Sequence, residues 1–334
     1  MQVLIIGGTG LISTGITRTL IAGGHDVACF TRGQRDVSLP DAVSFHEGDR
    51  NESEDLERTV ERVDPDVVID MVCFDPEQAS AAVECCAGRI DQYVFCSTVD
   101  VYHRPVARAP ITEAAPRSPP VSDYGAGKAA AEDVFMDAHG DAFATTIIRP
   151  WSTYGEGGTI NHTFGNDTYY LDRIRQGKPI VVHGDGTSMW AACHRDDVAV
   201  AFANAVGNPA AYGEAYHVTS EEHMTWNQYH RTVARAIDAP EPTFVHIPTA
   251  LLRTIAPERT GMLEAHFQYS TVFDNAKARR DLDFQYTIPL EEGVRRTVAH
   301  LERTTGIDDW DSTDDDHIIA AWQDTTDTFV DQFT

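Results

Sequence analysis

A glycine-rich turn near the start of the chain, Gly7-Gly8-Thr9-Gly10, constrains the fold more than any other segment. Residues 2–6 before it are apolar and rich in β-branched side chains, as in a buried strand, and the stretch from residue 11 to Gly23 is compatible with a helix. A strand, a tight turn and a helix in this order let backbone N–H groups approach a pyrophosphate without interference from Cβ atoms. Ser13 stands where the last glycine of such turns usually lies and is small enough to keep helix and strand close. The segment therefore predicts a dinucleotide-binding fold.

The rest of the N-terminal half alternates between strand and helix patterns. Strands are expected at residues 27–30, 43–47, 67–73, 93–96 and 145–148, with helical segments between most of them. Such alternation predicts an α/β fold, a Rossmann-type doubly wound parallel sheet with helices on both faces. Ligands of these folds bind at the carboxyl ends of the strands, so the residues there are the candidates for a site.

Tyr124 and Lys128 lie four residues apart in Ser122-Asp-Tyr-Gly-Ala-Gly-Lys128. Four residues are about one helical turn, so the phenol and the ammonium are expected on the same helix face. A free tyrosine loses its proton only near pH ~10, and a neighbouring cation lowers that value toward neutrality. The pattern alone recurs by chance in amphipathic helices. Downstream of a dinucleotide-binding turn, it predicts a proton-transfer pair.

With these features, the chain resembles the extended short-chain dehydrogenases/reductases of the NAD(P)-dependent sugar epimerase/dehydratase type over most of its length. The other motifs that carry the resemblance occur in the order of the family: Ser97-Thr-Val-Asp-Val-Tyr102, Arg149-Pro150 with Tyr154-Gly155, Gly184-Asp-Gly186, His194-Arg-Asp-Asp-Val198, Asp274-Asn-Ala-Lys-Ala278 and Leu290-Glu-Glu-Gly-Val294.

The resemblance implies a catalytic set of Thr98, Tyr124 and Lys128. Thr98 would hydrogen-bond the reacting oxygen of the substrate, and Tyr124 would donate or remove its proton while hydride moves to or from the nicotinamide. Lys128 would bind the nicotinamide ribose and hold the pKa of Tyr124 down. A threonine after a strand is more often a turn residue, so the weight of Thr98 comes from its place in the motif. Cofactor contacts are implied for Gly7, Thr9, Gly10, Leu11, Ile12, Asp49, Arg50, Lys128 and Pro150.

The end of the second expected strand bears on the choice between NAD and NADP. Folds that prefer NAD place a carboxylate there to bind the adenosine ribose, whereas this chain has Thr31 and Arg32. A guanidinium and a hydroxyl suit a 2′-phosphate, so NADP is favoured over NAD. The competing interpretation of Arg32 is a solvated surface charge.

The sequence defines the substrate less clearly than it defines the cofactor. Relatives that act on nucleotide sugars usually carry an arginine soon after the Gly-Asp-Gly segment, and Trp190 stands there in this chain. A diphosphate clamp is thus in doubt unless Arg195 or Arg259 replaces it, and a smaller or non-nucleotide sugar is possible. The substrate contacts that we expect are Asp100, Tyr154, Asn161, His162 and Trp190.

The reaction type can be narrowed by the residues after Thr98. The dehydratase branch has an acid pair at this point, and this chain has Val99-Asp100, which disfavours 4,6-dehydration. Epimerisation and simple carbonyl reduction both remain open.

Composition restricts the partners. With 52 acidic and 26 basic residues the chain carries a formal net charge of −26, which repels nucleic acid and anionic membranes. Lysine is nearly absent (Lys128, Lys178 and Lys277), a bias that resembles proteins of salt-loving organisms. The six cysteines show no metal-ligand spacing, and no long apolar run or leader pattern occurs. We expect no metal, a cytoplasmic location, a small sugar-type substrate and a homodimer.

Two interleaved lobes are expected. Residues 1–150 and about 191–237 would form the dinucleotide-binding domain, and residues 151–190 and about 238–334 a smaller C-terminal substrate-binding lobe. Two function classes stay open: an NAD(P)-dependent sugar oxidoreductase or epimerase, with an NADPH-dependent reductase of small carbonyl compounds as its rival, and a non-catalytic dinucleotide-binding regulator.

Overall fold

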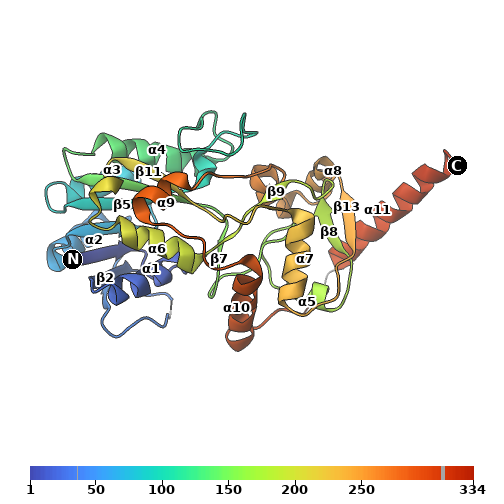
Figure 1. The fold of residues 1–334 in the computed structure, drawn as a ribbon, viewed down its shortest axis with the longest axis horizontal. Helices are drawn as coiled ribbons and strands as arrows, with labels where there is room; N and C mark the ends of the chain where they lie inside the picture. The colour runs from blue at the N-terminus through green and yellow to red at the C-terminus, as the bar shows by residue number, and fades with distance from the viewer. Residues whose placement is uncertain (36, 310–312) are drawn as a thin grey trace. The chain divides into compact units, whose positions relative to one another are not determined.

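The computed structural model describes residues 1–35, 37–309 and 313–334, with the side chain of residue 313 excluded (Figure 1). The contacts of the chain define two compact units. The first consists of Met1–Thr153, Ala191–Glu221 and Phe273–Ile288, and the second of Tyr154–Trp190, Glu222–Val272 and Pro289–Thr334. The interleaving resembles the expected lobes but differs in two places, because helix α7 (Trp226–Ala236) belongs to the second unit and Phe273–Ile288 to the first.

A seven-stranded parallel sheet forms the centre of the first unit. Its order is β11-β6-β5-β4-β1-β2-β3, so the direction of strand succession reverses between β1 and β4. This arrangement confirms the predicted doubly wound α/β fold and places a topological switch point beside β1. The strands are β1 (Gln2–Ile6), β2 (Asp26–Thr31), β3 (Ser44–Glu47), β4 (Val67–Asp70), β5 (Gln92–Cys96), β6 (Ala144–Pro150) and β11 (Glu214–Val218).

Helices cover both faces of this sheet, as Figure 1 shows for α3 and α4 on one face and α1 and α6 on the other. Alternate residues of β1 enter two separate cores: Val3 and Ile5 join one, and Leu4 and Ile6 the other. This is the period-two alternation of a strand buried on both faces. The first core is closed by α1 (Leu11–Ala22), α6 (Arg195–Ala205) and α9 (Ala276–Leu282), and the second by α2 (Ser53–Val63), α3 (Pro76–Cys86) and α4 (Asp123–Asp137).

The fourth strand is shorter than the sequence predicted. It ends at Asp70 rather than at Cys73, because the Asp70 carboxylate accepts a hydrogen bond from the Val72 amide at 2.9 Å and turns the chain away from the sheet. The apolar residues after Asp70 extended the strand-like sequence pattern to Cys73, but the strand pairs with its neighbours in the sheet only as far as Asp70. Because of this turn, Phe74 lies in a loop at the carboxyl end of the sheet, where it is part of the candidate site.

The second unit has small sheets and an aromatic core. Trp190 and Trp226 lie 4.7 Å apart between ring centroids, and Phe267 packs on both. The last helix begins against this unit, where Asp315 pairs with Arg259 at 2.7 Å and Asp316 with Arg173 at 3.0 Å. The elements are α5 (Tyr169–Arg175), β8 (Ile180–His183), β9 (Met189–Trp190), β12 (Met224–Thr225), α7, β13 (Phe244–Ile247), α8 (Thr249–Ile255), α10 (Leu290–Arg303) and α11 (Thr313–Asp331).

Among the described residues, none of the helices combines the length and the apolar character that crossing a lipid bilayer requires.

Candidate active site

A cavity of about 350 Å³ opens in the first unit at the carboxyl ends of β1, β2 and β4. Its position is the switch point of the sheet, where doubly wound folds bind their ligands. Of the residues predicted to bind a cofactor, Gly7, Thr9, Gly10, Thr31, Arg32, Asp49 and Arg50 line it.

The glycine turn forms one wall of this cavity. Gly7 has a φ of 83°, and a Cβ there would lie 2.7 Å from the Val72 side chain, so the turn accepts glycine only. Ser13, in place of the usual last glycine, contributes a bond that glycine lacks. Its hydroxyl accepts from the Gly10 amide at 2.7 Å and donates to the Gly7 carbonyl at 2.8 Å. Serine thus ties the turn to α1 and keeps the helix N-terminus at the cavity.

The predicted residues on α1 and β6 take different positions. Leu11 and Ile12 form the first turn of α1, whose amide groups lack intrahelical partners, as at any helix start, and so suit an anionic phosphate. Pro150 ends β6 and is buried outside the lining of the cavity.

The end of β2 and the residues after it bring basic groups to the cavity. Arg32 and Arg35 are both exposed and line the cavity together with Thr31, whose hydroxyl accepts a hydrogen bond from the Gly33 amide at 3.1 Å. Arg50 behaves differently, because its guanidinium is buried and paired with Asp70 at 2.5 Å. The charge of Arg50 is therefore largely neutralised by Asp70, whereas Arg32 and Arg35 bring positive charge to the cavity lining that suits an anionic ligand.

The catalytic candidates lie close together at the end of β5 and on α4. Lys128 is 2 % exposed, and its ammonium donates to the Cys96 carbonyl at 2.8 Å and lies 5.9 Å from the centre of the Tyr124 ring. The predicted common face of Tyr124 and Lys128 thus exists. Thr98 caps the short helix Val99–Val101, with its hydroxyl 3.1 Å from the Asp100 amide. Asp100 accepts from the Thr98 hydroxyl at 3.2 Å and so stays beside the catalytic candidates.

The pKa of Tyr124 differs from the sequence-based expectation that Lys128 would lower it. Tyr124 is 45 % exposed as a whole residue, but partial desolvation of its phenol, followed by electrostatic repulsion from Cys96 and Asp100, raises its pKa above the ordinary value, while the Thr98 hydroxyl acts in the opposite direction. The predicted lowering of this pKa by Lys128 is therefore not found in the free protein. Burial also lowers the pKa of Lys128 itself. At neutral pH the phenol keeps its proton.

Two glycines of α4 set how closely the helix that carries Tyr124 and Lys128 approaches its surroundings. A Cβ on Gly125 would overlap the Asp100 carbonyl oxygen, and a Cβ on Gly127 would overlap the Phe74 carbonyl oxygen. Both contacts are with backbone atoms, which cannot turn aside as a side chain can. The sequence Tyr124-Gly-Ala-Gly-Lys128 therefore brings the helix against the segments that carry Thr98 and Phe74.

Phe74 connects the cavity with the catalytic candidates. It lines the cavity, its ring lies 4.9 Å from the Lys128 ammonium, and its centroid is 6.5 Å from that of Tyr124. Sequence reasoning missed Phe74 because it placed this segment near the end of a strand. It also missed Gln34, Arg35, Asn51 and Gln78, which line the same cavity. A second arginine three residues after Arg32 was a signal that could have been used.

The other predicted substrate residues lie in the second unit and are largely buried. Trp190 is 1 % exposed in the aromatic core, and the Tyr154 ring lies against Gly293. His162 stacks on Tyr170 with ring centroids 4.8 Å apart and bonds Asp167 at 2.9 Å. Asn161 is half-buried beside it. Trp190 in particular has a packing role that accounts for its position.

Comparison with known proteins assigns the chain to a family. Residues 3–219 match the model of the NAD dependent epimerase/dehydratase family. The chain belongs to this family of enzymes. A curated relative, the 2'-dehydrokanamycin reductase of Streptomyces kanamyceticus, is 31% identical over 241 residues, which are 72% of this chain and 68% of the relative. The UDP-glucose 4-epimerase of Mycolicibacterium smegmatis is 26% identical over 89% of this chain and 97% of its own.

Solved structures agree on the fold. An epimerase from Methanothermobacter thermautotrophicus superposes with a TM-score of 0.74 at 18% identity, covering 91% of this chain and 92% of that one. The UDP-glucose 4-epimerase of Thermotoga maritima, solved with UDP-glucose, gives 0.72 at 20% identity over 91% of this chain and 100% of that one. A further curated relative by sequence is the chloroplast stem-loop binding protein of 41 kDa b from Arabidopsis thaliana. It is 27% identical over 96% of this chain and 84% of that protein.

Proposed function

We propose that this protein is an NADP-linked oxidoreductase or epimerase that acts on a hydroxyl or carbonyl group of a sugar-type substrate. The observation that carries the proposal is the place of Phe74. One ring both lines the glycine-turn cavity and contacts Lys128 and Tyr124, so a dinucleotide that enters at the glycine turn reaches the proton-transfer pair within one unit of the fold.

The residues of the cavity suit a nicotinamide dinucleotide. Gly7 and Gly10 leave the turn open to a pyrophosphate, and the first amides of α1 complement its charge. Such a cofactor, once bound, would supply or accept the hydride. Arg32 and Arg35 beside Thr31 favour a 2′-phosphate, and hence NADP, because a guanidinium binds phosphate oxygens through paired hydrogen bonds.

Proton transfer is assigned to Tyr124. In reduction its phenol gives a proton to the substrate oxygen as that oxygen gains charge, and in oxidation the phenolate takes the proton back. Thr98 would hold the substrate oxygen through its hydroxyl. Lys128 would place a positive charge beside the phenolate and bind ribose hydroxyls. The raised pKa of Tyr124 keeps the phenol protonated at neutral pH, which is the form that donates a proton during reduction.

The sugar-type substrate is supported by the relatives that act on sugars or on a sugar-containing compound by name, the epimerases and 2'-dehydrokanamycin reductase. Reduction of a small carbonyl compound is the alternative, favoured by the likeness to 2-alkyl-3-oxoalkanoate reductases. A non-catalytic role is the weaker candidate. One relative is named for stem-loop binding, but a net charge of −26 repels RNA.

The test is to incubate the protein with a panel of keto-sugars, nucleotide sugars and simple ketones, in parallel with reduced and with oxidised dinucleotide, while following nicotinamide absorbance. Stoichiometric consumption identifies a reductase, and a new product without net consumption identifies an epimerase. Tyr124→Phe should abolish either activity, and Tyr212→Phe, elsewhere in the same unit, should not. Tight dinucleotide binding without turnover of any compound would support the regulator instead, and full turnover by Tyr124→Phe would refute the assigned mechanism.

A further inference from the structure

We propose that Glu132 and Arg149 are positioning residues, a buried ion pair that fixes Thr98 and the helix carrying Tyr124 and Lys128 in one geometry. This inference rests on the proposed function, in which those three residues act on the substrate. Neither residue lines the cavity, and the hydrogen bonds of the pair go to groups other than the Tyr124 phenol, so its action would pass through the backbone segments that it joins.

Glu132 connects three elements from its place on α4. It lies one helical turn beyond Lys128 and is fully buried. Its carboxylate accepts from the Arg149 side chain on β6 at 2.7 and 2.6 Å, and from the Ser97 hydroxyl at the end of β5 at 2.5 Å. Ser97 precedes Thr98 directly. One carboxylate therefore ties the catalytic helix to the strand end that delivers the catalytic threonine.

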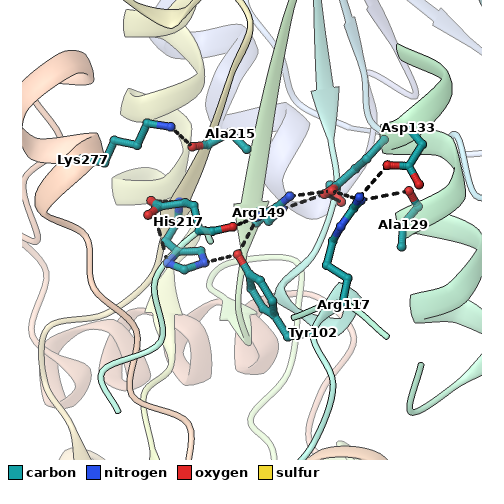
Figure 2. Close-up of polar contacts among 11 residues, drawn as sticks. Tyr102, Arg117, Ala129, Asp133, Arg149, Ala215, His217 and Lys277 are labelled. Atoms are coloured by element: carbon teal, nitrogen blue, oxygen red, sulfur yellow. Dashed lines mark hydrogen bonds and ion pairs between the residues drawn. The ribbon is translucent and has the colours of Figure 1, made fainter. Parts of the chain in front are cut away.

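Arg149 holds the other end of the same segment. Beyond its two bonds to Glu132, its remaining terminal nitrogen donates to the Tyr102 hydroxyl at 2.5 Å, as Figure 2 shows. Ser97 and Tyr102 bracket the short helix that follows Thr98. Both ends of this catalytic segment are thus bonded to a single ion pair, one through Glu132 and the other through Arg149.

The direction of the hydrogen bonds is fixed along the chain of partners. The Asp274 carbonyl can only accept, so the His217 nitrogen 3.2 Å from it carries a proton and the other ring nitrogen accepts. The Tyr102 hydroxyl then donates to that nitrogen at 2.6 Å and accepts from Arg149. Burial and the charge of Arg149 lower the pKa of His217 to about 3, which keeps the ring neutral. The Tyr102 hydroxyl and the His217 ring therefore each have one consistent set of donor and acceptor roles, as a positioning device requires.

A purely structural role is the competing explanation, since any buried ion pair that loses one partner destabilises a fold. Gln92 offers a matched control. It is fully buried at the opposite end of β5, bonds Thr146 on β6 at 3.0 Å, and adds bonds to the Ala205 carbonyl and the Gly207 amide at 2.8 Å. Gln92→Leu therefore weakens the same pair of strands far from Ser97.

The experiment compares Glu132→Gln, Arg149→Lys and Tyr102→Phe with Gln92→Leu and the unmodified protein. Glu132→Gln keeps the shape of the side chain, Arg149→Lys keeps the charge but cannot bond both neighbours, and Tyr102→Phe removes a single hydroxyl. The proteins carry 3-fluorotyrosine, and the ¹⁹F resonance of residue 124 is assigned by its loss in Tyr124→Phe. Turnover and KM for NADPH are measured with the substrate found in the panel above.

We expect the three network variants to shift or broaden the Tyr124 resonance and to lower kcat by about tenfold to hundredfold, while KM for NADPH changes by less than about twofold. Gln92→Leu should lower the melting temperature but leave both readouts unchanged. The inference is overturned if the network variants match Gln92→Leu in both readouts at equal loss of stability. Full turnover by Tyr124→Phe would instead refute the proposed function, and the ¹⁹F comparison would still decide whether the pair positions the helix.

Discussion

The Lys128 ammonium donates a hydrogen bond to the Cys96 carbonyl oxygen at 2.8 Å, two residues before Thr98. The helix that carries the lysine is thereby joined to the strand that delivers the threonine. Because the ammonium is buried, it has few other ways to satisfy its charge, and the aromatic rings of Phe74 and Phe95, each 4.9 Å away, take part of that role. The position of the α4 helix relative to Thr98 thus depends on the same cation to which the proposal assigns a role in proton transfer.

Replacing this cation should separate those two roles. Lys128→Met fills the same volume with an apolar chain, so we expect the fold to persist and turnover to fall by about 100-fold or more. The measurement is kcat beside the melting temperature. Lys178→Met, at an exposed site in the second unit, is the control and should retain full turnover. An active Lys128→Met protein would contradict the role given to the ammonium.

Gly125 should tolerate no larger residue. In Gly125→Ala the new methyl group overlaps the Asp100 carbonyl, and we expect the free energy of unfolding to fall by about 1–3 kcal/mol, together with a loss of turnover. Gly261→Ala is the matched control, because that helical glycine faces open space and should gain up to about 1 kcal/mol. Chemical denaturation measures both. Equal effects at the two positions would show that close packing of α4 is not required.

Arg32 should discriminate between the two dinucleotides. Arg32→Ser removes a guanidinium from the cavity wall, and we expect the Kd for NADPH to rise by about tenfold to hundredfold while that for NADH changes little. Titration of nicotinamide fluorescence gives both constants. Arg58→Ser, which removes an exposed arginine of α2, controls for the loss of surface charge. A parallel loss of affinity for both dinucleotides would argue against a 2′-phosphate site.

His217 should make the stability depend on pH. Its pKa is about 3 in the folded protein and 6.5 for the free side chain, so between these values the unfolded chain binds the additional proton. The stabilisation is complete above pH 6.5 and is lost as the pH falls toward 3, by about 5 kcal/mol at most. The charged groups around the ring are Arg149 and Lys277, with Glu113 3.9 Å away, and Tyr102 bonds it.

The measurement is the difference in free energy of unfolding between the unmodified protein and His217→Gln across that pH range. Glutamine can still accept from Tyr102 but does not titrate. We expect the difference to shrink as the pH falls, because the unmodified protein alone loses the contribution of this ring. A difference that stays constant would mean that His217 is not held neutral.

The charge of the chain should make its stability depend on salt. With 52 acidic against 26 basic residues, self-repulsion loosens the fold at low ionic strength, and added ions screen it. We expect the melting temperature to climb steeply in molar KCl. Replacing the exposed Asp324, Asp327 and Asp331 of α11 with asparagine should lessen the slope. A flat response in the unmodified protein would remove the link to adaptation to high salt.

The parts of this molecule that depend on local patterns could be predicted from the sequence. The sheet, the glycine turn and the shared face of Tyr124 and Lys128 follow from periodicity and short spacing. The network around Glu132 could not be predicted, because Arg149 is 17 residues away from it and His217 is 115 residues from Tyr102. Only the order of strands β5, β6 and β11 in the sheet brings these groups together.

Trp190 illustrates a second limit. Its place after Gly184-Asp-Gly186 indicated a substrate contact, yet the ring is buried against Trp226 and Phe267, and that packing depends on segments 36 and 77 residues further along the chain. The pKa of Tyr124 could not be predicted from the sequence either. The spacing shows that a cation is near the phenol, but it does not show how far the fold removes the phenol from water.

The scarcity of lysine has a practical consequence for chemical modification. Lys128 is buried and Lys277 bonds the Ala215 carbonyl at 2.8 Å, whereas Lys178 is exposed. Among the three lysines, an amine-directed acylating reagent would therefore attach first at Lys178, leaving the interior amine for a much slower second phase. Homogeneous tagging or surface immobilisation through one side chain becomes feasible without redesigning the protein.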